Sequence, residues 1–353
     1  MPYPRIAAEP DFARLETILR RGTPDRVPFV ELIIDQPVLV AIREAPFSED
    51  PAQRWNQLAE AWRRLGYDYL PVGLEAPLPR RDLYARDTAV LSQGDRMWIN
   101  ENTGVIESWE DFERYPWPRP EGLDYSALEH AAKALPEGMR LIAQGPGGVL
   151  ENVMWLMGYA PMSYAMADDP TLVEAMFARV GELLLHAFRN AAAHEAVGAL
   201  WLGDDMGFKT QPMISPEALR QYVFPWQRRI AEIAHAAGKP FLLHACGNLE
   251  TVMDDLIDYV KIDGKHSFED VIMTVPEAKR RWGNRVAVLG GVDMDLLSRG
   301  TPDKVRARTR EVLEECMPGG GFGLGSGNTV ANYVPLENYF ALLEEGWRRG
   351  AYA

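Results

Sequence analysis

The sequence predicts a (β/α)8 barrel, a closed ring of eight parallel strands surrounded by helices. Eight short apolar runs alternate with longer helical patterns along the 353 residues. The runs are continuous rather than alternating, as expected for strands that are covered on both faces. A doubly wound open sheet is the second interpretation, but no GxGxxG turn follows any early strand. We therefore expect the barrel.

Each expected strand is a short apolar stretch, in several cases with β-branched side chains. In chain order, the strands are expected at residues 27–34, 68–73, 140–144, 199–203, 240–244, 260–263, 286–290 and 322–326. Residues 87–108 break the alternation, because they alternate in polarity and contain the turn signals QGD and ENTG. We expect a β-hairpin insertion there. With a helix before the first strand, residues 1–353 are expected to form one barrel domain.

Four expected helices begin with the same signal, a capping residue followed by proline. The pairs are Asp50-Pro51, Asp169-Pro170, Ser215-Pro216 and Thr301-Pro302. The side-chain oxygen of the first residue accepts a bond from a free backbone N–H, and proline at the first helical position has no N–H to lose. Gly66 and Gly238 are expected to end two helices. Pro225 is expected to kink the helix that contains it.

The composition excludes several classes of function. Lysine and arginine total 37 against 51 aspartates and glutamates, a formal charge of −14, which argues against nucleic acid or an anionic membrane surface as the partner. No uncharged apolar stretch is long enough to span a bilayer. Two cysteines cannot form a disulfide framework, and no signal peptide is visible, so a cytoplasmic location is expected.

Polar side chains cluster where the expected strands end. Active sites of (β/α)8 barrels lie at the carboxyl ends of the strands, so these side chains are the predicted site. The candidates are Glu75, Gln144, Asp204, Asp205, His244, Cys246, Lys265, His266, Ser326 and Asn328. A small-molecule substrate is therefore the expected ligand, with Glu75, Gln144, Ser326 and Asn328 among the residues that would bind or orient it.

His244 and Cys246 form the most specific pair. They are two residues apart at a strand end, so both side chains point the same way. An imidazole and a thiolate make half of a zinc site. The alternative is a hydrogen-bonded histidine beside a small buried cysteine.

The sequence leaves more than one role possible for each of two further pairs of neighbouring residues, Asp204-Asp205 and Lys265-His266. Asp204 or Asp205 could supply a third ligand, a general base or a hydrogen bond to substrate, or could cap a loop. Adjacent residues of a strand face opposite ways, so at most one of them is expected to enter the pocket. Lys265 and His266 could bind an anionic group of the substrate or could form ion pairs with nearby carboxylates.

Several segments resemble one known superfamily. They are GPGG at 145–148, LGDDMGFKTQPMISPEALRQYVFP at 202–225, HACGN at 244–248, VLGGVD at 288–293 and GLGSGN at 323–328. Together they resemble the uroporphyrinogen decarboxylase superfamily, which contains decarboxylases and cobalamin-dependent methyltransferases. The resemblance implies a (β/α)8 barrel, in agreement with the strand count, and a monomer or homodimer.

Within that superfamily, the chain resembles the methyltransferases more than the true decarboxylases. The decarboxylases hold a polycarboxylate porphyrinogen with an arginine-rich stretch after the first strand and an aspartate after the second. Here residues 27–38 read VPFVELIIDQPV, and Glu75 stands near the second position. The methyltransferases bind zinc with a His-x-Cys pair and a later cysteine. His244 and Cys246 match the pair, while Ser326 stands where the later cysteine is expected, and Asp205 could replace that ligand.

The resemblance implies a reaction as well. A methyl group would move between a corrinoid such as methylcobalamin, carried by a partner protein, and a small thiol or pterin acceptor. Zinc would lower the pKa of a substrate thiol, and Asp204, Asp205 and His266 are the expected catalytic residues. The alternatives are a decarboxylase of a porphyrinogen or a small carboxylate, and a binding barrel without catalysis.

Overall fold

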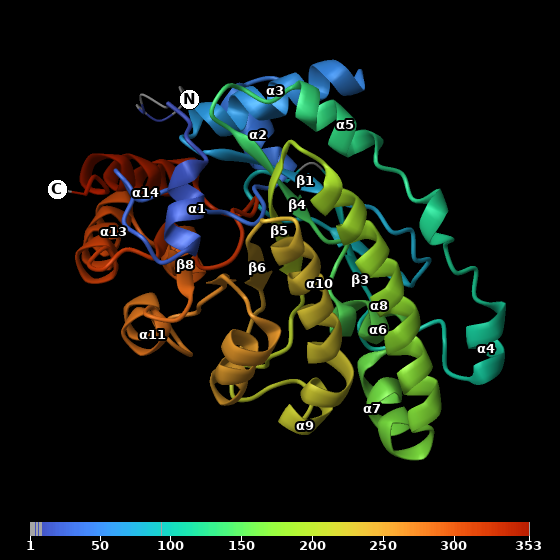
Figure 1. The fold of residues 1–353 in the computed structure, drawn as a ribbon. Coiled ribbons are helices and arrows are strands. Elements are labelled where there is room, and N and C mark those ends of the chain that lie inside the picture. Colours follow the sequence, from blue (N-terminus) through green and yellow to red (C-terminus); the bar gives the residue numbers. More distant parts are fainter. Residues whose placement is uncertain (1–3, 5, 7–8, 93, 353) are drawn as a thin grey trace.

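The computed structural model describes residues 4, 6, 9–92 and 94–352. Its main sheet has seven parallel strands in spatial order: β1 (Tyr69–Gly73), β4 (Arg140–Gln144), β5 (Val197–Gly203), β6 (Phe241–His244), β7 (Gly264–His266), β8 (Ala287–Val292) and β9 (Phe322–Ser326). Helices lie around this sheet (Figure 1). The predicted (β/α)8 barrel is confirmed.

The expected first strand, residues 27–34, is extended chain rather than a full strand. It completes the ring beside β9, where the Val30 N–H donates to the Leu324 carbonyl at 2.8 Å. On its other side, the Glu31 N–H donates to the Tyr69 hydroxyl of β1 at 2.7 Å. A phenol therefore takes the place of a backbone carbonyl at this joint, and a regular ladder with β1 does not form there.

The strand expected at residues 260–263 is wrong by a few positions. A π-helical turn, η4 (Asp255–Val260), reaches to Val260, and Lys261 then adopts a left-handed conformation with φ 69°. Val260 and Ile262 are buried, which explains the apolar signal, but the strand itself is β7. Consequently Lys265 and His266 lie within a strand rather than after one.

The hairpin begins and ends a few residues earlier than the expected range 87–108. It pairs β2 (Asp82–Arg86) with β3 (Asp95–Ile99) in antiparallel register. Of the QGD signal, Gly94 precedes β3 and Asp95 is its first residue, while Gln93 lies outside the described residues. The ENTG segment, residues 101–104, follows β3. There the Asn100 side chain accepts a bond from the Asn102 N–H at 2.9 Å, which turns the chain out of β3.

The helices confirm the predicted start signals. Asp50, Asp169, Ser215 and Thr301 each accept a backbone N–H bond at the start of a helix. Pro225 lies second in its helix and follows a π-helical turn, η2 (Leu219–Val223), a local irregularity typical of such a proline. The helices are α1 (Ala13–Leu19), α2 (Gln36–Arg43), α3 (Pro51–Arg64), α4 (Trp109–Arg114), α5 (Ser126–Lys133), α6 (Val149–Met157), α7 (Tyr159–Asp168), α8 (Pro170–Ala193), α9 (Pro216–Ala218), α10 (Phe224–Ala236), α11 (Val275–Trp282), α12 (Met294–Arg299), α13 (Pro302–Cys316) and α14 (Leu336–Arg349).

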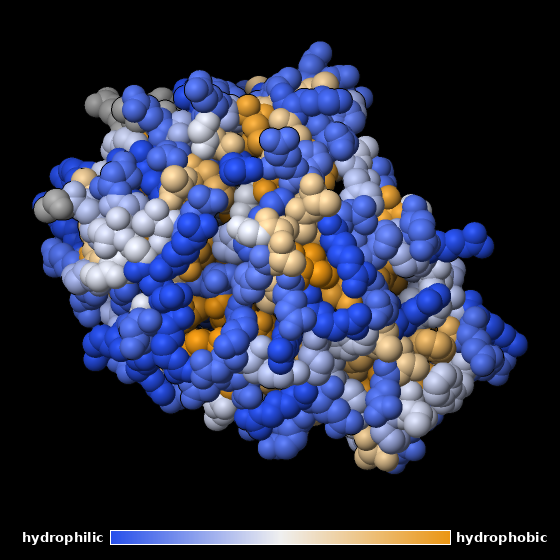
Figure 2. All heavy atoms as spheres, in the orientation of Figure 1, coloured by the Kyte–Doolittle hydropathy of each residue, from blue (hydrophilic) through white to orange (hydrophobic). Residues whose placement is uncertain are grey.

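The strands and the inner faces of the helices share one apolar core. The face shown in Figure 2 is mainly hydrophilic, with apolar side chains visible in hollows between polar ridges. Every helix that the structure describes is too short or too polar to cross a membrane. The core therefore fixes the strand ends, and the polar residues that follow them lie on a rigid frame.

Candidate active site

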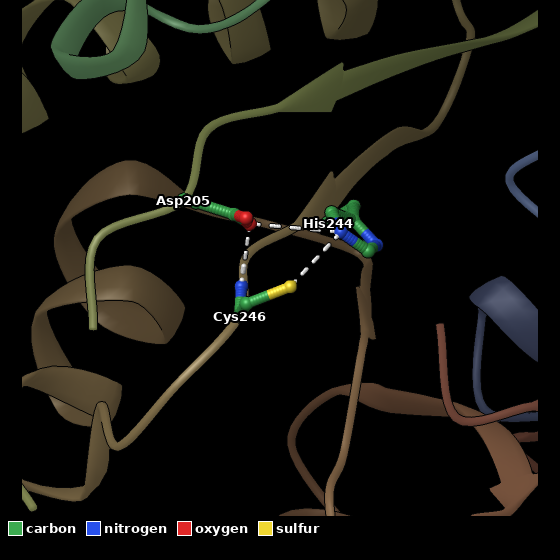
Figure 3. A group of neighbouring side chains, drawn as sticks. All are labelled: Asp205, His244 and Cys246. Atoms are coloured by element: carbon green, nitrogen blue, oxygen red, sulfur yellow. Dashed lines mark hydrogen bonds and ion pairs between the residues drawn. The ribbon is translucent and has the colours of Figure 1, made fainter. Parts of the chain in front are cut away.

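Three side chains with metal-binding chemistry meet at the ends of β5 and β6. Asp205, His244 and Cys246 place their potential ligand atoms within 4.8 Å of one another. His244 Nε2 lies 3.4 Å from Cys246 Sγ and 3.6 Å from Asp205 Oδ1 (Figure 3). The imidazole and the sulfur lie close together, and Asp205 joins them. Their role as metal ligands stays a prediction.

The local chain path explains this convergence. His244 ends β6, and two residues later the Cys246 N–H donates to Asp205 Oδ1 at 2.7 Å. Gly247 then turns the chain with φ 83°, where a Cβ atom would lie 2.0 Å from the Gly207 carbonyl oxygen. A side chain at this position is excluded, so the HACGN loop folds tightly against the loop that carries Asp205.

The sulfur of Cys246 receives two hydrogen bonds. Asn328 Nδ2 donates at 3.1 Å and Ser267 Oγ donates at 3.4 Å. Burial, and after it the Asp205 carboxylate, raises the pKa of the Cys246 thiol well above its ordinary value. Two donors aimed at the sulfur would suit a thiolate, and a bound cation would supply the charge that favours that form.

His266 lies directly behind His244. The two Nδ1 atoms are 2.8 Å apart, and both rings are buried. Burial lowers the pKa of His244 to about 3 and lowers the pKa of His266 as well, so both imidazoles are neutral near pH 7. The bond therefore leaves His244 Nε2 facing Cys246 and Asp205.

Asp204 faces away from this group, as strand alternation predicts. Its carboxylate lies at the start of α6, where it accepts from the Val149 N–H at 3.1 Å and the Glu151 N–H at 3.2 Å. Gln227 Nε2 donates to the same carboxylate at 2.8 Å. Burial raises the pKa of Asp204 to about 7. Its visible role is to anchor α6, and the catalytic role expected from the sequence stays a prediction.

Glu151 is a site residue that sequence reasoning missed. Its carboxylate accepts from the Gly148 N–H at 3.0 Å in a helix-capping arrangement. Burial raises the pKa of Glu151 well above its ordinary value, and the carboxylates of Asp205 and Asp204 raise it further. The only signal was a glutamate three residues after the GPGG turn, a pattern that also suits ordinary capping.

Three more of the expected site residues differ in the contacts that they make. Lys265 is 2% exposed, and its ammonium donates to the carbonyls of residues 245, 266 and 267 at 2.7–2.9 Å. Gln144 Nε2 donates to the Leu32 carbonyl at 2.5 Å. Glu75 is exposed after β1 and makes no hydrogen bond or ion pair with the described residues. Substrate binding by these three side chains stays a prediction.

Ser326 contacts Glu31, a second residue that the sequence analysis missed. Ser326 Oγ donates to Glu31 Oε2, and the Ser326 N–H donates to Glu31 Oε1, both at 2.6 Å. Burial raises the pKa of Glu31 to about 8. A single charged residue inside the apolar run VPFVELII was the available signal.

Replacing Glu31 by glutamine is expected to change how stability depends on pH. The folded protein holds the Glu31 proton up to about pH 8, whereas the unfolded chain releases it near 4.5. The free energy of unfolding of the parent protein should therefore fall, relative to Glu31→Gln, as pH rises from about 4.5 to 8, by a few kcal/mol. Urea unfolding across this range measures the difference. Glu75→Gln, at an exposed carboxylate, should show no such trend, and a flat difference for Glu31→Gln would contradict the prediction.

Comparisons with known proteins give the family. Residues 101–346, more than half of the chain, match the family described as Uroporphyrinogen decarboxylase (URO-D). A methylated-thiol–coenzyme M methyltransferase of Methanosarcina mazei is 33% identical over 43% of this chain and 41% of its own length. A uroporphyrinogen decarboxylase of Anaeromyxobacter dehalogenans is 24% identical over 54% of this chain and 53% of its own length.

The solved structures agree on the fold. A methyltransferase from Methanosarcina mazei superposes with a TM-score of 0.69 and 19% identity, covering 96% of this chain and 98% of that chain. The aligned part spans about half the length of the curated relatives. The chain belongs to the uroporphyrinogen decarboxylase family, and part of it is similar to a methyltransferase.

Proposed function

We propose that this protein is a methyltransferase that moves a methyl group between a corrinoid, carried by a partner protein, and a small thiol or pterin acceptor. The convergence of Asp205, His244 and Cys246 at the strand ends carries the proposal. The similarity to a methyltransferase that acts on methylated thiols supports the same reaction class. The absence of arginine from residues 27–38 disfavours a porphyrinogen with many carboxylates as substrate.

The three side chains fit a zinc ion. Nitrogen, sulfur and carboxylate oxygen are the donors that zinc takes in proteins, and three protein ligands leave a fourth position for substrate. The hydrogen bonds from Asn328 and Ser267 to the sulfur of Cys246 suit a metal-bound thiolate. In this proposal Asp205 replaces the later cysteine of the family pattern, and Ser326 stays bonded to Glu31.

The protein's residues would position the acceptor and manage its proton. A bound zinc ion would stabilise a substrate thiolate. Asp205 would serve as the third ligand, and the nearby Glu151 carboxylate, in its ionised form, would receive the thiol proton. The acceptor sulfur would form a bond to the methyl carbon while the carbon–cobalt bond breaks, and the electron pair of that bond would remain on cobalt. In-line alignment of the two reactants is the barrel's contribution.

Methylcobalamin demethylation tests the proposal. The zinc-loaded protein is mixed with methylcobalamin and, in separate assays, with 2-mercaptoethanesulfonate or tetrahydrofolate, and the cobalamin spectrum is followed. Acceptor-dependent loss of methylcobalamin is the expected result. Failure with every acceptor, even with added zinc and corrinoid proteins, would overturn the proposal. Conversion of uroporphyrinogen to coproporphyrinogen would instead establish the decarboxylase.

His266 is proposed to set the tautomer of His244. If His244 Nε2 binds a metal, its Nδ1 carries the proton and donates to His266 Nδ1 at 2.8 Å. Residues that hold a metal-binding histidine in this way typically contribute 10-fold to 100-fold in metal affinity. His266 is thus a positioning residue for His244.

Two substitutions at His266 separate this role from simple packing. His266→Phe keeps a ring but removes the acceptor, and zinc affinity measured by competition with a chelator should fall about 10-fold to 100-fold. His266→Asn keeps a short polar acceptor and should recover part of that loss. Equal zinc affinity in the parent protein and both folded variants would show that His266 does not orient His244.

A further inference from the structure

A second hollow lies between the hairpin and α6. Its volume is about 510 Å3, and it is open to solvent. Its lining residues are Arg80, Leu83, Met97, Trp98, Ile99, Glu101, Asn102 and Trp155. The chain that leaves the hairpin is fixed to the end of α6, because the N–H groups of Val105 and Ile106 both donate to the Leu156 carbonyl, at 2.7 and 2.9 Å. The wall of the hollow is therefore attached to the barrel.

Arg80 provides an unpaired cation in this hollow. Its guanidinium lies 4.5 Å from the centre of the Trp155 ring, and the side chain is half-buried. Within the described part of the chain it forms no hydrogen bond or ion pair, although the charges of Asp82 and Glu151 act on it through space. Burial lowers the pKa of Arg80. A partly desolvated guanidinium favours a bound anion, which it can contact through two parallel N–H groups.

Trp155 provides a second unpaired donor. Its indole N–H is buried and has no acceptor among the described residues. The ring packs on the GPGG turn so closely that a Cβ atom on Gly147 would lie 2.5 Å from it. Buried indole N–H groups usually have a partner. The fixed ring and its free N–H therefore indicate an acceptor that the chain itself does not supply.

The hairpin adds flat and apolar surface to the same hollow. Trp98 is 44% exposed, Met97 is 50% exposed and Leu83 is 39% exposed. Exposed side chains of this size, gathered at one place, are typical of binding sites. An indole and a thioether both pack well against an unsaturated ring.

We propose that this hollow binds a planar unsaturated molecule that carries a carboxylate or a sulfonate. Arg80 would pair with the anionic group, the Trp155 N–H would donate to the ligand, and Trp98 and Leu83, which lie opposite each other on one face of the hairpin, would pack on its ring. Trp155 lies one helical turn after Glu151 in α6, and the Glu151 carboxylate is close enough to Asp205 for the two charges to interact. The ligand would therefore lie beside the candidate active site. The binding itself does not depend on the proposed methyl transfer.

Calorimetric titration with 2-naphthoate tests the proposal on the full chain. Saturable binding is expected, and Arg80→Gln should weaken it at least about 10-fold, because it removes a charge-assisted contact. Arg81→Gln is the matched control, since the neighbouring Arg81 is exposed and does not line the hollow, and it should change affinity by less than about twofold. Trp155→Phe, which keeps a ring but removes the N–H, should also weaken binding.

Two ligand analogues separate the contributions. For the parent protein, 2-naphthamide lacks the charge and should bind about as weakly as 2-naphthoate binds to Arg80→Gln, while cyclohexanecarboxylate lacks the flat ring and should also bind poorly. Arg80→Lys keeps the charge and should retain binding, which guards against a misfolded hairpin. Titrations with and without a zinc chelator should give the same affinity for 2-naphthoate. The test therefore distinguishes this proposal from the proposed methyl transfer, because it holds even if no zinc is bound. Absence of saturable 2-naphthoate binding, or equal affinity in Arg80→Gln, would overturn the proposal.

Discussion

The double variant His244→Ala/Cys246→Ser is expected to lose its zinc and its methyl transfer together. Only Asp205 would remain of the three proposed ligands, and a single carboxylate does not hold zinc. Protein purified without chelators should contain about one zinc per parent chain, and the double variant should contain less than about a tenth of that amount. Elemental analysis measures the metal, and methylcobalamin demethylation measures the activity.

The cysteine that ends α13 gives a matched control. Cys316 is buried, and it is not one of the three proposed zinc ligands, so Cys316→Ser should keep its zinc and its activity. Circular dichroism should show the same helix content in all three proteins. Parent-like zinc content in the folded double variant would contradict the metal site, and parent-like demethylation would contradict the proposed reaction.

Replacing Lys265 by methionine is expected to cost about 3–5 kcal/mol in the free energy of unfolding. Methionine fills nearly the same space but donates no hydrogen bond. The ammonium of Lys265 donates to three carbonyls, those of Ala245, His266 and Ser267. Without it, the carbonyls of Ala245 and Ser267 would lose this donor, and that of His266 would keep only the Ala245 N–H at 3.3 Å. Each buried acceptor left without a donor costs about 1–3 kcal/mol. Urea unfolding followed by tryptophan fluorescence measures the change.

The same carbonyls belong to the strand ends that carry the candidate site. Lys265→Met should therefore also weaken zinc binding, because Ala245 lies between His244 and Cys246. Lys209→Met, at an exposed lysine, is the control and should shift the free energy of unfolding by less than about 0.5 kcal/mol. A shift of that small size for Lys265→Met would show that the three bonds contribute little.

Local signals account for the parts of the fold that could be predicted. Cap-proline pairs such as Asp50-Pro51 act within one helical turn, so the sequence alone determines their effect. The strand expected at 260–263 was wrong because two buried side chains, one at the end of a π-helical turn and one just after it, resemble a strand in sequence. The first strand was misjudged for a different reason, because a tyrosine distant in sequence takes the place of its backbone partner.

In the candidate site, too, the features that depend on local sequence could be predicted and the long-range contacts could not. The spacing of His244 and Cys246 and the opposite orientations of Asp204 and Asp205 follow from strand alternation, which the sequence contains. The contact of Glu31 with Ser326 joins residues 295 positions apart. Such a contact exists only after the ring closes, so no local pattern could predict it.

The phenol of Tyr69 gives the ring of strands one weak point. Where few backbone bonds join neighbouring segments, the free energy of local opening is low. Between residues 27–34 and β1, the described hydrogen bonds both involve the Tyr69 hydroxyl, which accepts from the Glu31 N–H and donates to the Glu31 carbonyl. By contrast, β5, β6 and β7 are joined by backbone ladders. In the order of the sheet, β6 lies opposite this joint. Local opening of the ring is therefore expected at this place, on the side away from the imidazole and the sulfur, whose spacing it would leave unchanged.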